Sequence, residues 1–176
     1  MGEAYHEHLV KRKNTAEGMM LRIFVVLACV SSVIVGMGTN PLVFAISVAL
    51  AYLVRYVFHA TDVEYEYIYI SGEIEISKIC GKMKRKTLKT FDIENLEMLA
   101  PEGDDELQTF ERQEHQVFDY SSLVKENQKY VAFIRKDSNL TKIIFEPSEA
   151  IVKEAKMMAP RKVVFKESKK VELNKD

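Results

Sequence analysis

The chain has 176 residues, of which 47% are hydrophobic and 29% charged, and its 25 basic residues nearly balance its 26 acidic ones. A formal net charge of −1 lacks the basic excess that is typical of nucleic-acid-binding proteins, so we expect no nucleic acid among the partners. The only two cysteines, Cys29 and Cys80, lie in an apolar and a polar part of the chain, which excludes a disulfide framework.

The N-terminal segment, residues 1–18, mixes a few apolar side chains with the basic run Lys11-Arg12-Lys13. This mixture predicts a cytoplasmic amphipathic segment, in the form of a short helix lying along the membrane surface. His6 and His8 are two imidazoles without a third ligand in view, so we assign them no metal and no cofactor.

Two apolar runs follow, at residues 19–37 and 41–58, and a short external loop at 38–40 joins them. About 20 helical residues span the hydrocarbon core of a bilayer, and each run is just long enough. Gly38 can end the first helix, and Pro41 suits the first position of the second. The pattern predicts two transmembrane helices that form an α-helical hairpin.

Basic residues flank both runs and indicate the orientation of the hairpin. Arg22 and Arg55 lie at nearly equal distances from the loop, so an antiparallel pair places them at one depth. We predict that Lys11, Arg12 and Lys13, together with these two arginines, are membrane-interface anchors. Since cytoplasmic flanks carry the excess of basic residues, the chain is expected to be a multi-pass cell-membrane protein with both termini cytoplasmic. The alternative, that the first run belongs to a cleaved signal peptide, lacks an alanine-type cleavage site.

Small residues recur at four-residue spacing in the two runs, which favours close helix packing in lipid. These predicted helix-packing residues are Ala28, Ser32, Gly36, Ala45 and Ala49. They either pack within the hairpin or join copies of the chain into a homo-oligomer.

From residue 62 the hydrophobic period changes to that of strands. Val63 to Ile76 alternates around a Ser71-Gly72 turn, which predicts a β-hairpin. Further strands are expected at 83–91, 93–99, 116–120, 130–135 and 141–145. A helix follows Pro147, with Ile151, Ala155 and Met158 on one face, and it stops at Pro160.

Many antiparallel strands followed by one helix are the element order of a pleckstrin-homology-like (PH-like) domain. We therefore expect a mainly-β soluble domain over 62–166, a PH-like barrel of about seven antiparallel strands capped by a C-terminal helix, with 167–176 as a charged tail. An OB-type barrel would place its helix between the third and fourth strands.

A basic run at a predicted strand turn is the strongest candidate site. Its members are Lys82, Lys84, Arg85, Lys86 and Lys89. Near an anionic leaflet such a run contacts lipid headgroups, although alternation places Lys84 and Lys86 on one face and Arg85 on the other. A solvated edge strand protected by lysines explains the run equally well, and an acidic protein partner is a further alternative.

Catalytic signatures are absent from the sequence. It contains no Gly-rich phosphate loop, no Gly-x-Ser-x-Gly and no His-Glu-x-x-His. The acidic stretch at 102–106 lacks the ligand spacing of a calcium loop, and His115 near Asp119 is weak evidence for a catalytic pair. We therefore predict that the protein is not an enzyme.

Several segments together carry a resemblance to a known family. They are the opening Tyr5-x-Glu7-x-Leu9-Val10-Lys11-Arg12-Lys13, the two apolar runs, the Glu64–Ile79 hairpin with Gly72, the Lys82–Lys86 run and Phe145-Glu146-Pro147. The chain resembles an uncharacterised family of small bacterial two-helix membrane proteins with a cytoplasmic PH-like domain. The resemblance supports the fold and implies no catalytic or binding residues.

Two functions remain as hypotheses. In the first, the chain is a noncatalytic adaptor or scaffold that presents its domain to a protein partner at the inner membrane face. In the second, it is an anionic-lipid or small-ligand sensing module that uses the Lys82–Lys89 run.

Overall fold

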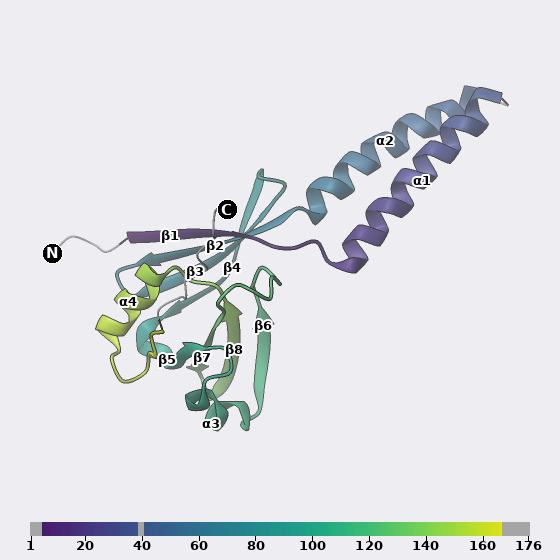
Figure 1. Ribbon diagram of the computed structural model, residues 1–176. Helices are drawn as coiled ribbons and strands as arrows, with labels where there is room; N and C mark the ends of the chain where they lie inside the picture. Colours follow the sequence, from purple (N-terminus) through teal and green to yellow (C-terminus); the bar gives the residue numbers. More distant parts are fainter. Residues whose placement is uncertain (1–4, 39–40, 167–176) are drawn as a thin grey trace, which may run out of the picture.

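The computed structural model describes residues 5–38 and 41–166. Its elements are the strands β1 (Tyr5–Lys11), β2 (Val63–Ile70), β3 (Glu73–Cys80), β4 (Lys84–Asp92), β5 (Leu96–Pro101), β6 (His115–Asp119), β7 (Tyr130–Lys136) and β8 (Asn139–Phe145), and the helices α1 (Ala16–Gly38), α2 (Pro41–Thr61), α3 (Gln108–Glu111) and α4 (Glu149–Met158). Figure 1 shows the α1–α2 hairpin projecting from a mainly-β domain. The predicted tail at 167–176 and most of the predicted loop at 38–40 lie outside the described residues.

The strands form two four-stranded sheets, with the orders β1-β2-β3-β4 and β5-β7-β8-β6. Eight strands are therefore described, where the sequence predicted about seven. All pairs are antiparallel except β6–β8, which is parallel and corrects the prediction of an entirely antiparallel domain. Residues 120–138, which include β7, separate β6 from β8, so this parallel pair is not joined by a tight hairpin and is not visible in strand periodicity.

The predicted N-terminal interfacial helix is wrong. Residues Tyr5–Lys11 form a strand that pairs with β2 along its whole length, from Tyr5↔Ile70 to Lys11↔Glu64. His6, His8 and Val10 face the domain while the residues between them are exposed, which is the period-two pattern of an edge strand. The β domain therefore begins before the helices, and the helical hairpin is inserted between two neighbouring strands of one sheet.

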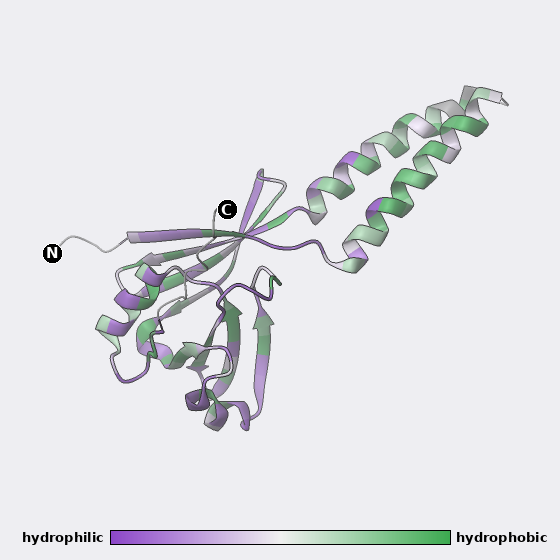
Figure 2. Ribbon diagram, viewed as in Figure 1, coloured by the Kyte–Doolittle hydropathy of each residue, from purple (hydrophilic) through white to green (hydrophobic). Residues whose placement is uncertain are grey.

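The inserted hairpin is largely apolar, as the hydropathy colours of Figure 2 show along both helices. Half-buried Ala28, Ser32 and Gly36 follow one side of α1, in keeping with the predicted packing face. Ala45 and Ala49 are exposed, and buried Ser47 and Val57 instead lie on the packed side of α2. Of the two alternatives for these alanines, their exposure leaves contact with a second copy of the chain as the remaining prediction, because the small-residue spacing does not specify which face of α2 meets α1.

One buried cluster joins the two sheets and α4. Phe145 of β8 contacts Tyr67 of β2 and Phe91 of β4 edge-to-face, with ring centroids 5.6 and 6.4 Å apart. From α4, fully buried Ile151 and Ala155 enter the same cluster. Met158, which the sequence also placed on that face, is 51% exposed, although its sulfur accepts a hydrogen bond from Tyr69. The helix thus closes one end of the domain, on the side away from the helical hairpin (Figure 1).

Candidate functional site

A groove of about 1100 Å³ lies between α2 and the β3–β4 hairpin, at the root of the helical hairpin. Figure 1 shows the tip of the β3–β4 hairpin rising beside the lower end of α2. The residues that line this groove are Tyr52, Arg55, Tyr56, His59, Ala60, Lys78, Cys80, Gly81, Met83, Lys84, Arg85 and Lys86. We call it the basic groove.

Helix α2 forms one wall of the basic groove. Tyr52, Arg55, Tyr56 and His59 follow the spacing i, i+3, i+4 and i+7, which places them on one helical face. All four are exposed. From the sequence, Arg55 was expected only to be an interface anchor, and this spacing was the signal that could have grouped it with the other three.

The turn between β3 and β4 forms the opposite wall and is held against the root of α2. Gly81 and Lys82 both have positive φ values, 55° and 58°. The backbone N–H of Gly81 donates to the carbonyl of Asp62, at 2.8 Å. A Cβ at position 81 would lie 2.7 Å from Nδ1 of His59, so glycine permits both the turn and the close approach of the helix.

Three lysines give this wall its charge. Lys78 of β3 lies directly opposite Lys86 of β4 in the register, and Lys84 lies opposite Cys80. Like charges at directly opposite positions destabilise a sheet by a few tenths of a kcal/mol up to about 1 kcal/mol. Within residues 5–38 and 41–166, none of the three lysines has an ion pair with a carboxylate, so the repulsion is not compensated there.

The predicted basic run is divided by the structure. Lys84, Arg85 and Lys86 all line the basic groove, but the guanidinium of Arg85 pairs with Glu66 at 2.8 Å and with Glu75 at 3.4 Å. Lys82 lies in the turn, and Lys89 packs its ammonium over the ring of Phe118 at 5.3 Å. The run is therefore not a single site, as strand alternation already indicated for Arg85.

The carboxylates around Arg85 have shifted acidities. Burial raises the pKa of Glu66, and the charge of Arg85 acts in the opposite direction. Hydrogen bonds from Ser77 and Thr87 lower the pKa of Glu75, so this carboxylate stays ionised. Arg85 is thus held by protein carboxylates and contributes little free positive charge to the basic groove.

A comparison with known families gives the domain its class. The model of the family described as Bacterial PH-like domain (DUF6106) matches residues 2–165. The chain belongs to this family. No curated protein and no solved structure matches the chain significantly. The match supports a PH-like binding module without catalytic activity, and it includes β1 and both helices within one family unit.

The helices of this PH-like protein differ in how clearly they qualify as membrane spans. Helix α1 has 23 residues and contains an 18-residue stretch with a mean hydropathy of 2.3, so it is long and apolar enough to cross a membrane. In α2, the apolar stretch is Ala45–Thr61, which is shorter than α1.

Most of the predicted interface anchors contact the protein itself. Lys11 pairs with Asp62 at 3.0 Å, and Arg12 donates to the hydroxyl of Tyr65 while its guanidinium lies over that ring. The backbone N–H of Lys13 donates to the carbonyl of Ser122 at 2.7 Å. These contacts tie the root of α1 to the PH-like domain. Arg22 and Arg55, the other two predicted anchors, lie within the helices.

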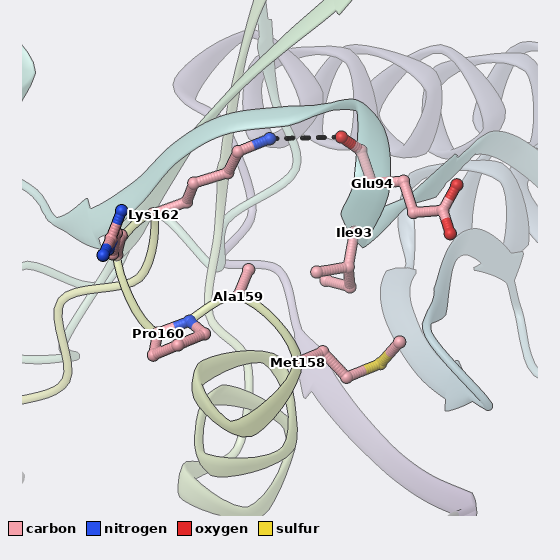
Figure 3. Close-up of a pocket in the computed structure, with 7 residues that line it drawn as sticks. Ile93, Glu94, Met158, Ala159, Pro160 and Lys162 are labelled. Carbon is pink, nitrogen blue, oxygen red and sulfur yellow. Dashed lines mark hydrogen bonds between the residues drawn. The ribbon is translucent and has the colours of Figure 1, made fainter.

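A smaller cleft of about 370 Å³ lies beside the end of α4. Figure 3 shows Ile93, Met158, Ala159 and Pro160 around it, with Nζ of Lys162 bonded to the carbonyl of Glu94 at 3.2 Å. Its surface is mainly apolar, and Glu94, Arg161 and Lys162 are the charged residues that line it.

The histidines and the aspartate considered in the sequence make contacts within the protein. Among the described residues, no three His, Cys, Asp or Glu side chains come together as metal ligands. His115 contacts the carbonyl of Gln113, and Asp119 accepts a hydrogen bond from the backbone N–H of Ser121, so these two side chains have different partners. His8 stacks on Tyr67, and burial lowers its pKa.

Proposed function

We propose that this protein is a noncatalytic, membrane-anchored binding module that holds an anionic phosphate group in the basic groove. The observation that carries the proposal is the cluster of Lys78, Lys84 and Lys86 opposite Arg55, with no carboxylate pairing these cations among the described residues. A bound phosphate would relieve the repulsion between Lys78 and Lys86 and accept several charge-assisted hydrogen bonds. The family match, to a PH-like domain, supports a binding role.

Membrane anchoring by both helices is part of the proposal. At 1.5 Å per residue, α1 and α2 are about 34 and 32 Å long, close to the thickness of a bilayer core. Because the two helices are inserted between β1 and β2, the chain leaves the sheet after β1 and joins the same sheet again at β2. The whole domain therefore lies on one side of the membrane, and the basic residues near the helix ends next to the domain favour the cytoplasmic side.

The first test is lipid binding by the full chain. The protein is purified in a neutral detergent with equal amounts of dioleoylphosphatidylglycerol and dioleoylphosphatidylcholine, and retained lipid is counted by native mass spectrometry. We expect preferential retention of the anionic lipid. The double variant Lys84→Glu/Lys86→Glu should lose about tenfold or more, because two charge-assisted contacts become repulsive.

The matched control for this test is Lys136→Glu. Lys136 is exposed, lies on β7 and takes no part in the basic groove. It makes one of the same Lys→Glu reversals outside the groove, half the charge change of the double variant, so retention of the anionic lipid should remain as in the parent protein. Equal retention of the two lipids by the parent protein, or an equal loss in the control and the double variant, would refute the proposal.

The second test concerns topology. Because the domain is expected on the cytoplasmic side, a protease added to intact spheroplasts should leave it whole, whereas the same protease should digest it in inverted membrane vesicles. Alkaline carbonate should leave the protein in the membrane pellet, since two apolar helices hold it there. Digestion in intact spheroplasts or release by carbonate would contradict a cytoplasmic domain on a membrane hairpin.

An adaptor role is the second candidate, and the cleft beside α4 favours it. Its apolar surface with Arg161 and Lys162 at the rim suits an apolar side chain of a partner that also carries an acidic group. Crosslinking from membranes should recover a specific protein, and Met158→Lys should abolish that crosslink. Exposed Ala45 and Ala49 also leave one face of α2 for contact with a second hairpin, so homo-oligomerisation stays a proposal.

A further inference from the structure

We infer that the phosphate in the basic groove belongs to a phospholipid of the leaflet that surrounds the hairpin, held between Arg55 on one side and Lys84 and Lys86 on the other. This inference rests on the proposed function and names the source of the anion. Soluble phosphates share the chemistry of the headgroup, so the position and surroundings of Arg55 distinguish the two sources.

Two arginines occupy the same level of the hairpin but have different surroundings. Arg22 lies six residues after the start of α1, and Arg55 lies six residues before the end of α2. Each arginine therefore lies about 9 Å along the helix axis from the end of its helix that is nearer the domain. Arg22 donates to Oγ1 of Thr61 at 2.6 Å and to the carbonyl of Phe58, and it lies over the Phe58 ring.

Arg55 has no such partners within the described part of the chain. Its exposed side chain lines the basic groove. A guanidinium at this depth in a membrane hairpin needs an anionic or carbonyl partner, because hydrocarbon provides none. Arg22 meets this need with protein oxygens. For Arg55, the nearest source of oxygen anions at the same depth is the phosphate layer of the bilayer.

The shape and composition of the groove fit a lipid that is still in the membrane. Along α2 the groove extends from Tyr52 to Ala60, eight residues or about 12 Å, which exceeds the thickness of one headgroup layer. Tyr52 and Tyr56, which are 73% and 67% exposed, line the part of the groove farther from the domain. In membrane proteins, amphipathic rings of this kind lie beside the headgroups. Above them α2 exposes apolar side chains such as Leu42 and Ile46, which suit acyl chains.

The chemistry of the contact follows from these positions. Arg55 presents a planar donor fork that matches two phosphate oxygens, whereas the lysines are compact charges that need no fixed direction. A phosphodiester with attached acyl chains satisfies both walls of the basic groove and continues into the apolar surface above it. A soluble phosphate leaves that surface uncovered and gains less from binding.

The test separates the lipid from its headgroup in the full chain. Protein in detergent is loaded with dioleoylphosphatidylglycerol, and glycerophosphoglycerol, the same headgroup without acyl chains, is added in large excess. We expect the soluble headgroup to leave the lipid in place. Arg55→Gln should lower lipid retention by about tenfold, and Arg55→Lys should restore part of it, because charge returns without the donor fork.

Each outcome of this test has a defined meaning. Arg55 is exposed, so Arg55→Gln should keep the circular dichroism spectrum of the parent protein, and Lys136→Gln serves as the matched control. If glycerophosphoglycerol displaces the lipid, or if Arg55→Gln binds as the parent does while Lys84→Glu/Lys86→Glu does not, the lipid source is wrong and anion binding stands. If the parent protein retains no anionic lipid and binds no glycerophosphoglycerol, the proposed function fails as well.

Discussion

Replacing Phe145 with alanine is expected to lower the free energy of unfolding by about 3–5 kcal/mol, the usual cost of removing a fully buried aromatic side chain. Phe145 is 0% exposed and contacts Tyr67 and Phe91, so its ring joins β8 to two strands of the other sheet. The variant leaves a cavity between the sheets. Urea unfolding of the full chain in detergent, followed by far-ultraviolet circular dichroism, measures the loss.

Val117→Ala is the control for this prediction. Val117 is also apolar and lies on β6 of the same sheet as β8, but it is largely exposed. Its truncation should change the free energy of unfolding by less than about 0.5 kcal/mol. If Phe145→Ala costs no more than this control, the two sheets do not share the core described above.

Replacing Glu146 with alanine is expected to lower the free energy of unfolding by about 3 kcal/mol, because the hydrogen bonds of a buried carboxyl group are lost and the donors of Ser122 remain buried. Glu146 is 4% exposed, and its Oε1 accepts from the backbone and hydroxyl of Ser122 at 2.8 and 2.7 Å. Its Oε2 accepts from the side-chain amide of Asn127 at 2.9 Å. These bonds hold the loop after β6 against the end of β8.

The loss of the Glu146 hydrogen bonds should also affect the segment that leads into the N-terminal end of α1. Ser122 also accepts from the backbone N–H of Lys13, so the loop that Glu146 holds is the loop that fixes the entry of the helix. Hydrogen exchange at Lys13 should therefore accelerate in Glu146→Ala together with exchange at Ser122. Glu126→Ala, an exposed carboxylate in the same loop, is the control and should leave both rates unchanged. Unchanged protection at Lys13 in Glu146→Ala would show that the helix entry is held independently of this network.

Local sequence signals were sufficient for much of the fold. The Ser71-Gly72 turn joins β2 to β3 in the predicted hairpin, with φ values of 47° and 96° at the two turn residues. Ser148 caps α4 by accepting from the backbone of Ile151, and the helix ends just before Pro160. Residues that form turns, cap helices or end helices act over a few neighbouring positions, so their effect can be predicted without the rest of the chain.

Other features depend on partners that are distant in sequence. The period-two pattern of Tyr5–Lys11 was present in the sequence, but its basic end and its position before an apolar run favoured a surface helix. Only the free edge of β2, more than 50 residues later, makes it a strand. The candidate site likewise has a part that the sequence predicted and a part that depends on distant segments. Alternation separated Arg85 from Lys84 and Lys86, whereas Lys78 and the face of α2 join them only when β3 and α2 meet.

By itself the sequence determined two apolar helices with basic roots, the strand order around Ser71-Gly72, a closing amphipathic helix and the charge of the β3–β4 turn, since these follow from local period and composition. The tertiary structure decided that the helical hairpin interrupts a sheet, that β6 runs parallel to β8, and that Arg55 faces the lysines across a groove. The physical reason is that pairing and packing energies depend on which surfaces meet, and the meeting surfaces here are separated by tens of residues along the chain.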